Sequence, residues 1–322
     1  MSYIPKVYRD SGGDRQVIAA GGILRMEPGS MVQYANPTGA ADYYVDGNVS
    51  ATGEGTIDSP YLTLAEAITA SNSSIDDDTT RWWARRNRIF VMGDQEITEN
   101  LTIFPEKCDV IGLGFDIEAM PRITGTHIIA AWATGKAYGT RFFNCGFMNN
   151  AAGPTVHLVT DEMAVEFHGC LFWPKVTGST HCILLEDDNR AFKMIGCRVM
   201  EHAAAPGTGI FAEGIKVSGT GQHDMVIRDN FIRATEGIHI EAGTGGYNGL
   251  IVNNIIHATA YVINDASKLW YVIDNRLITD VDTDTDPASG IVCKEEYACG
   301  NIITGSGTEG NADTFPWARV AT

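Results

Sequence analysis

The 322-residue sequence lacks the long apolar runs that membrane proteins need. No stretch of about 18 apolar residues occurs, so we expect no transmembrane helix. The first ten residues also lack an apolar core followed by small residues, so we expect no secretory signal peptide. Basic residues are scarce, with 23 Lys and Arg against 40 Asp and Glu and a formal net charge of −17. Because nucleic-acid-binding proteins present a basic face, we expect neither nucleic acid nor membrane as a partner.

Short motifs for metal binding or catalysis are missing as well. The seven cysteines contain no C-x-x-C pair, and the eight histidines contain no H-E-x-x-H. Neither a G-x-S-x-G sequence nor a phosphate-binding loop is found. We therefore expect no cofactor and no structural metal. The odd number of cysteines is typical of reduced, buried thiols in a chain synthesised and folded in a cytoplasm.

What the sequence does contain is a short pattern that recurs through residues 142–305. Apolar residues are followed by a small or polar residue, then by a Cys or Asn marker and further apolar residues. The markers are Cys145, Cys170, Cys197, Asn230, Asn254, Asn275 and Asn301. Their spacings of 25, 27, 33, 24, 21 and 26 residues lie in the range of solenoid repeats. Alternating apolar residues, β-branched content and Gly/Asn/Asp turns favour strands over helices in each unit.

Stacked units of this kind place equivalent side chains above one another at the β-strand spacing of about 4.8 Å. The markers therefore predict a ladder of three cysteines and four asparagines. The 33-residue step is explained by an inserted loop at residues 203–211. The repeat resembles a right-handed parallel β-helix of the pectate-lyase type. The predicted fold class is thus all-β, with a short N-terminal capping helix and an N-terminal β arm.

The capping helix is expected where the β-helix begins. Thr63 and Glu66 form a capping box, and Leu64, Ala67 and Ile68 share one helical face. A short amphipathic helix of this kind can cover the apolar end of a solenoid. The segment that contains it, from residue 42 to residue 72, resembles the opening segment of pectate-lyase-like β-helices, a resemblance that implies the fold and not an activity.

The regions on either side of the β-helix differ from it in composition. Residues 1–40 combine a polar stretch with short apolar runs cut by Gly and Pro, and residues 73–78 read as a polar loop. We divide the chain into an N-terminal docking and oligomerisation arm at 1–40, the β-helix at 41–310 and a C-terminal tail at 311–322. The apolar runs of the arm are too short to form a core of their own, which indicates a partner surface.

The first 35 residues or so resemble the openings of many small virion proteins of tailed bacteriophages. Those proteins begin with a Lys-Val-Tyr-Arg-(Asp/Glu)-x-Gly-Gly-Asp-Arg-like segment, and here the segment at 6–15 reads Lys-Val-Tyr-Arg-Asp-Ser-Gly-Gly-Asp-Arg. The resemblance implies that the arm binds the capsid or another virion partner. The residues expected to make that contact are Tyr8, Arg9, Asp10, Asp14, Arg15, Ile23, Met26 and Met31.

The arm and the solenoid together favour a virion structural protein over an enzyme. We interpret the chain as a capsid decoration or head-fibre protein, assembled as a homotrimer and bound to the major capsid protein or another virion protein. The alternative is a short tailspike, a receptor-binding protein that binds or depolymerises host surface polysaccharide. A bacterial polysaccharide lyase is a third possibility, which the missing export signal disfavours.

Glu213 and Glu236 are the only catalytic candidates that the sequence offers. The segments 212–217 and 235–240 align at a distance of 23 residues, which would place the two glutamates on adjacent rungs, roughly 5 Å apart. That separation is close to the one between the carboxylates of a retaining glycosidase. Two glutamates exposed to solvent would give the same pattern by chance in so acidic a chain. We therefore expect no catalytic role for them.

Overall fold

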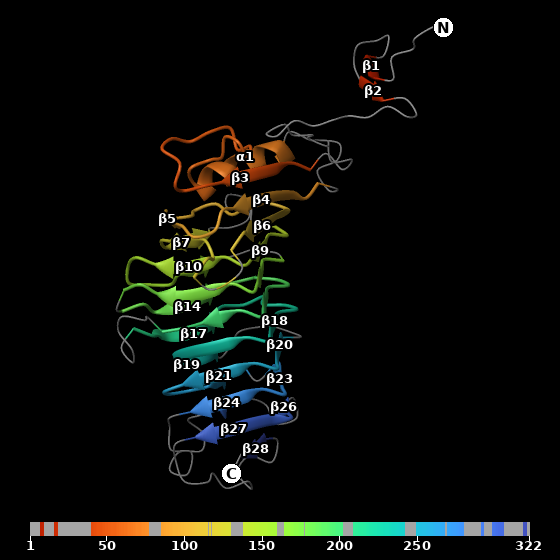
Figure 1. Cartoon of the computed structure of the whole chain (residues 1–322). Coiled ribbons are helices and arrows are strands. Elements are labelled where there is room, and N and C mark those ends of the chain that lie inside the picture. The colour runs from red at the N-terminus through yellow and green to blue at the C-terminus, as the bar shows by residue number, and fades with distance from the viewer. Residues whose placement is uncertain are drawn as a thin grey trace. The chain divides into compact units, whose positions relative to one another are not determined.

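The computed structural model describes residues 7–9, 16–18, 40–76, 85–114, 116, 118–129, 138–159, 164–176, 178–201, 209–241, 249–267, 269–279, 291–292, 298–305 and 318–320. The chain divides into two compact units, Met1–Gly39 and Ala40–Thr322. In the first unit, β1 (Val7–Arg9) and β2 (Gln16–Ile18) form an antiparallel pair. The second unit is a β-solenoid whose strands are stacked along one axis (Figure 1).

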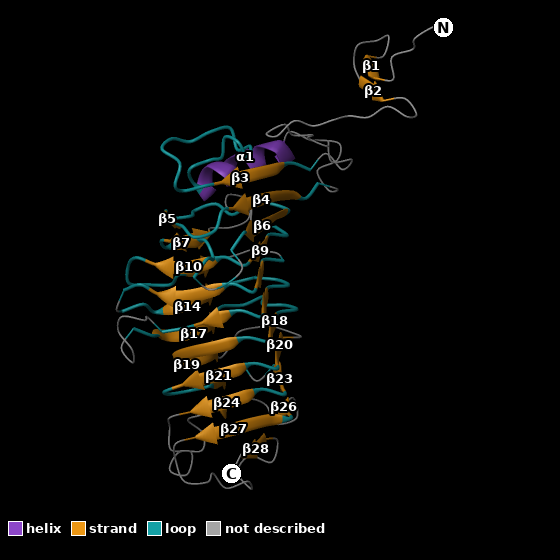
Figure 2. Ribbon diagram, viewed as in Figure 1, coloured by secondary structure: helices purple, strands orange, loops and turns teal. Residues whose placement is uncertain are grey.

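Two parallel sheets make up the solenoid (Figure 2). The ten-stranded sheet contains β3 (Asp42–Val45), β4 (Asn87–Val91), β6 (Cys108–Gly112), β9 (Arg141–Phe143), β12 (Glu166–His168), β15 (Lys193–Ile195), β18 (Val226–Arg228), β20 (Gly249–Val252), β23 (Trp270–Ile273) and β26 (Ala298–Cys299). Each strand in it belongs to the next turn of the chain, and each pair is parallel. This pairing confirms the predicted parallel β-helix.

The sixteen-stranded sheet consists of two rows that share one long strand. The first row contains β5 (Glu96–Thr98), β7 (Arg122–Thr124), β10 (Gly146–Asn149), β13 (Leu171–Pro174), β16 (Arg198–Val199), β19 (Phe231–Ile240), β21 (Ile255–Ala258), β24 (Arg276–Thr279), β27 (Asn301–Gly305) and β28 (Ala318–Val320). The second row contains β8 (His127–Ile129), β11 (Val156–Leu158), β14 (His181–Leu185), β17 (Phe211–Val217), β22 (Ile263–Asp265) and β25 (Ile291–Val292). β19 is long enough to pair in both rows, with β16 and β21 in the first and with β17 and β22 in the second.

The core is built from inward-facing residues that repeat in register from turn to turn. Phe142 pairs with Phe167, and Phe167 with Met194, and all three side chains are fully buried. The rings of Phe142 and Phe167 stack with their centroids 5.2 Å apart, and those of Phe147 and Phe172 with centroids 5.4 Å apart. Stacked aromatic side chains of this kind add to the burial of apolar surface that stabilises each turn.

The Cys and Asn markers lie at the bend between the ten-stranded sheet and the first row of the other sheet. The residue before every marker has a positive φ, between 53° and 68°. These residues are Asn144, Gly169, Gly196, Asp229, Asn253, Asp274 and Gly300. Only Gly, Asn and Asp adopt this conformation at little cost, which explains the small or polar residue that precedes each marker.

The predicted asparagine ladder is confirmed. The side-chain amide Nδ2 of Asn254 donates to Oδ1 of Asn275 at 2.9 Å and to the carbonyl of Ile227 at 2.9 Å. Asn230 and Asn275 donate in the same way, to Asn254 at 2.9 Å and to Asn301 at 3.0 Å. Each amide is at most 2% exposed, so the ladder satisfies buried polar groups along the axis.

Cysteines continue this ladder toward the N-terminus. The backbone amide of Cys197 donates to Oδ1 of Asn230 at 2.8 Å, and the amide of Cys170 points at Sγ of Cys197 at 3.4 Å. Cys145, Cys170 and Cys197 are buried free thiols, as the sequence predicted. Burial raises the pKa of the Cys145 and Cys197 thiols well above the ordinary range. Among the described cysteines, Cys299 alone is exposed.

The capping helix α1 (Leu64–Asp76) lies beside β3 at the end of the solenoid (Figure 1). The predicted capping box is present, because the Thr63 amide donates to Glu66 Oε2 at 3.0 Å and the Glu66 amide donates to Thr63 Oγ1 at 3.3 Å. A second cap was not predicted: Glu99 accepts hydrogen bonds from the amides of Leu64 and Ala65 at 2.9 and 3.0 Å. None of the helices in the described parts of the chain has the length and apolar character to cross a membrane.

The prediction of a polar loop at 73–78 is wrong for residues 73–76, which belong to α1. The helix continues there because Ile75 is buried and because Asn87 Nδ2 donates to Ser71 O at 3.1 Å and to Ser74 Oγ at 2.8 Å. Residues 77 and 78 lie outside the described part of the chain. The hydrogen bonds from Asn87 of β4 to Ser71 and Ser74 hold the last helical turn against the solenoid.

The structure also changes the ends of two other predicted segments. The inserted loop was placed at 203–211, but Phe211 is the buried first residue of β17, and residues 202–208 lie outside the described part. In the predicted tail, β28 pairs in parallel with β27, so this part of the chain adds a strand to the first row.

Tyr8 and Arg9 of the predicted arm contact belong to β1, and the other predicted contact residues, Asp10, Asp14, Arg15, Ile23, Met26 and Met31, are not described.

Candidate functional site

Polar residues gather on the outer face of β14, β17 and β19. In these parallel strands His181 pairs with Glu213, and Glu213 pairs with Glu236. The two glutamates thus lie opposite each other on adjacent rungs, as the sequence alignment predicted. Lys216 of β17 and His239 of β19 complete the group, and these two residues pair with each other on adjacent turns. We call His181, Glu213, Lys216, Glu236 and His239 the Glu–His cluster.

Glu213 lies at the centre of the Glu–His cluster. Its Oε2 is 2.5 Å from Nε2 of His181, and its Oε1 is 2.5 Å from Nδ1 of His239. The Nζ of Lys216 lies 3.6 Å from Oε1. Burial alone would raise the pKa of Glu213. Hydrogen bonds from the two imidazoles outweigh burial and hold this pKa well below its usual range. Glu213 is therefore an ionised carboxylate with both oxygen atoms already engaged.

Glu236 has the opposite character. Its Oε2 lies 3.4 Å from Nδ1 of His239, and this buried oxygen has no hydrogen-bond partner. Burial, together with the nearby charge of Glu213, raises the pKa of Glu236. The hydrogen bond with Glu213 raises the pKa of His239. Two carboxylates whose pKa values are pushed apart are typical of an acid and nucleophile pair, but Glu213 has no free oxygen with which to attack a sugar.

The sequence did not identify the basic partners of these glutamates. Lys216 and His239 are the fourth residues of the aligned segments Glu-Gly-Ile-Lys and Glu-Gly-Ile-His, so the alignment carried a signal for both. His181 precedes Glu213 by one turn and by the inserted loop, which hides the correspondence. One oxygen or nitrogen atom from each of Glu213, Glu236 and His239 lies within 4.8 Å of the others, so these three residues can hold a metal ion.

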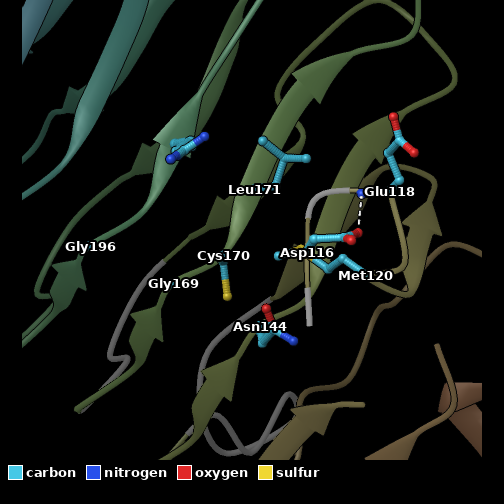
Figure 3. A pocket seen from close by; sticks show the side chains of 9 residues that line it. Asp116, Glu118, Met120, Asn144, Gly169, Cys170, Leu171 and Gly196 are labelled. Atoms are coloured by element: carbon cyan, nitrogen blue, oxygen red, sulfur yellow. Dashed lines mark hydrogen bonds between the residues drawn. The ribbon is translucent and has the colours of Figure 1, made fainter. Parts of the chain in front are cut away.

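A second candidate is a groove at the bend that the Cys markers occupy (Figure 3). It has a volume of about 560 Å³. The described residues that line it are Asp116, Glu118, Met120, Asn144, Gly169, Cys170, Leu171, Gly196 and Arg198. A side chain at Gly169 or Gly196 would project into open space, so the presence of glycine at these two positive-φ positions keeps the groove open. Asp116 and Glu118 form an acidic edge of the groove. Asp116 Oδ1 accepts hydrogen bonds from the backbone amides of Glu118 and Ala119, which fixes the backbone at this edge.

The outer face of the ten-stranded sheet carries a row of charges of alternating sign. Successive strands place these residues in register: Asp42, Arg88, Asp109, Arg141, Glu166 and Lys193. They pair along the axis, with Arg88 to Asp42 at 2.7 Å, Arg141 to Asp109 at 2.8 Å and Lys193 to Glu166 at 2.8 Å. Each of these three ion pairs joins two neighbouring turns on the surface.

Comparison with known proteins gives one similar solved structure and no sequence relative. No protein-family model matches the sequence, and no curated protein matches it. Among solved structures, the crystal structure of pectate lyase Pel9A is similar, with a TM-score of 0.43 and 11% sequence identity over 88% of this chain and 79% of that chain. The parallel β-helix of the present chain follows from its own strand pairing, independently of this neighbour.

Proposed function

We propose that the protein is a structural component of a tailed-bacteriophage particle, with the role of a capsid decoration or head-fibre protein. One observation carries the proposal: the phage-like opening segment belongs to a compact unit of its own, Met1–Gly39, while the β-helix forms the other unit. A short arm that attaches and a long solenoid that projects suit a decoration protein. In this role the arm binds the major capsid protein or another virion protein, and the site of action is the virion.

The side chains of the β-helix support a structural role over a catalytic one. Inside, the asparagine ladder satisfies its own polar groups from turn to turn. Outside, the charges of the ten-stranded sheet pair with one another along the axis. In the Glu–His cluster, both oxygens of Glu213 are occupied by imidazoles. These are the properties of a rigid spacer whose side chains stabilise its own stack.

A row of exposed apolar side chains supports assembly with further chains. Phe231 and Ile255 pair in register, and Ile302 continues the row after Arg276. Phe231, Ile255 and Ile302 are 37%, 40% and 42% exposed. Large apolar side chains gathered on one face of a β-sheet favour contact with another protein surface. We assign this row to contacts within a homotrimer.

Removal of the arm tests the proposal. A chain that begins at Ala41 should keep the β-helix fold, because α1 covers the end of the solenoid and each later turn packs on its neighbour. We expect its circular dichroism spectrum to retain the β-sheet signal of the full-length chain. We also expect it to fail to bind phage heads assembled without the protein, whereas the full-length chain should bind them, as measured by co-sedimentation.

The matched control is the full-length chain with the substitution Glu54→Gln, an exposed position of the β-helix unit that leaves the arm intact. This variant should bind heads as the unchanged chain does. Normal decoration by the truncated chain would refute the role of the arm. Binding of the full-length chain to tails and not to heads would refute the assignment to the head and favour the tailspike alternative.

A glycan assay separates the spike from the decoration protein. Incubation of the protein with host capsule or lipopolysaccharide should release no oligosaccharide, because Glu213 is held by His181 and His239. The substitutions Glu213→Gln and Glu236→Gln should leave decoration of heads unchanged. Release of reducing ends that either substitution abolishes would show that the two glutamates are catalytic and that the spike alternative is correct.

A further inference from the structure

We propose that Glu213, Glu236 and His239 form a binding site for a single divalent transition-metal ion of the zinc type. The three donor groups belong to two adjacent strands, β17 and β19, whose parallel pairing fixes Glu213 opposite Glu236. One donor atom from each residue lies within 4.8 Å of the other two. The site is thus assembled from different turns of the solenoid, which is why no metal motif is visible in the sequence.

The distances in this trio are near those that a tetrahedral ion imposes. Zinc binds imidazole nitrogen and carboxylate oxygen at about 2.1 Å, which places neighbouring ligand atoms roughly 3.4 Å apart. His239 Nδ1 and Glu236 Oε2 are already 3.4 Å apart. His239 Nδ1 and Glu213 Oε1 are 2.5 Å apart and would have to separate by roughly 1 Å to admit the ion between them. Nδ1 of His239 binds the ion only without its proton, so the bond to the ion replaces the hydrogen bond between His239 and Glu213.

The unsatisfied oxygen of Glu236 is the second observation that favours an ion. Its Oε2 is buried and has no hydrogen-bond partner, although it lies 3.4 Å from Nδ1 of His239. A buried carboxylate oxygen without a partner costs free energy, and coordination of a cation would remove that cost.

The charges around the trio also leave room for a divalent cation. The groups that face one another here are the carboxylates of Glu213, Glu236 and Glu241, the ammonium of Lys216, and the imidazoles of His181 and His239. Three carboxylates and one ammonium leave two negative charges when both imidazoles are neutral, which one divalent ion balances. Lys216 is anchored on Glu241 at 3.0 Å and can remain there while the ion binds.

The donor set indicates the kind of ion. Calcium and magnesium prefer oxygen ligands only, whereas a mixture of imidazole and carboxylate suits zinc and its neighbours. His181 holds the far oxygen of Glu213 at 2.5 Å, in the manner of the hydrogen-bonded groups that orient metal ligands in proteins. Since the ligands come from two turns and His181 from a third, the ion would tie three successive turns of the β-helix together.

The test uses the untagged full-length protein, freed of metal with a chelator and then titrated with Zn²⁺ in a calorimeter. We expect saturable binding to one site per chain. Glu236→Gln and His239→Gln should each weaken the affinity by at least about tenfold. The matched control is Glu186→Gln, because Glu186 forms a similar pair with His157 at 2.7 Å on the same face but takes no part in the trio. This control should bind Zn²⁺ as the unchanged chain does.

A spectroscopic measurement on the unchanged chain keeps the test independent of how the variants fold. Co²⁺ in place of Zn²⁺ should give the intense visible absorption of a tetrahedral nitrogen and oxygen site, and added Zn²⁺ should abolish it. Absence of Zn²⁺ binding, the weak absorption of octahedral Co²⁺, or equal affinity in the Glu236→Gln and Glu186→Gln variants would each overturn the proposal.

Discussion

Replacement of Asn254 with leucine is expected to lower the free energy of unfolding by at least about 3 kcal/mol. Asn254 Oδ1 accepts hydrogen bonds from the backbone amide of Asn230 at 3.0 Å and from its side chain at 2.9 Å. Asn254 Nδ2 donates to Ile227 O and to Asn275 Oδ1, both at 2.9 Å. Leucine is close to asparagine in size but can form none of these bonds, so polar groups on the preceding and the following turn lose a buried partner.

The control substitution is Asn48→Leu, which makes the same chemical change outside the asparagine ladder. Asn48 is exposed, and the hydrogen bond that involves it uses its backbone amide, which leucine retains. We expect this substitution to change the free energy of unfolding by no more than about 0.5 kcal/mol. Urea unfolding followed by circular dichroism measures both variants against the unchanged chain. Equal effects of the two substitutions would mean that the ladder contributes nothing beyond packing.

The fold could be predicted because the bend between the two sheets has strict local requirements. Each turn needs a residue with positive φ, followed by a buried side chain that reaches the next turn. These two requirements explain the recurring Gly-Cys and Asp-Asn pairs. The same pairs revealed the period and hence the stacking. The end of α1 was missed because the contacts that extend it, from Asn87 to Ser71 and Ser74, join residues from different elements.

The candidate site was predictable in part for the same physical reason. Glu213 and Glu236 were found because parallel strands pair residues one turn apart, so a simple alignment of neighbouring turns reproduces the register. His181 was missed because the inserted loop lies between it and Glu213. The cap that Glu99 forms on α1 was missed as well, since no local pattern connects residues 35 positions apart.

We expect the protein to lose stability in acid because His127 is buried as a neutral imidazole. Its side chain is fully buried, and its ring lies edge-on to Phe147 with centroids 5.7 Å apart. The backbone amide of Leu101 donates to His127 Nδ1 at 3.2 Å, so a proton on that nitrogen would break the hydrogen bond. Burial lowers the pKa of His127 from the ordinary value of 6.5 to about 4.

The sign of the effect follows from where the proton binds. Between pH 6.5 and about 4 the unfolded chain protonates His127 while the folded chain does not, so protons favour the unfolded state. Stability due to the neutral imidazole is therefore complete above pH 6.5 and is lost progressively as the pH falls to about 4. The difference between the two pKa values corresponds to roughly 3 kcal/mol.

Unfolding in urea at pH 7, 5.5 and 4 tests this prediction on the full-length chain. Carboxylates also titrate toward the acid end of this range, so the unchanged chain is compared with His127→Gln, in which the imidazole is absent. We expect the variant to lose roughly 3 kcal/mol less than the unchanged chain between pH 7 and pH 4. Ile129→Val, a core change on the same strand β8, should lower stability by roughly 1 kcal/mol at every pH and leave the dependence on pH unaltered. If His127→Gln loses as much stability in acid as Ile129→Val does, the buried imidazole is not what makes the β-helix sensitive to acid.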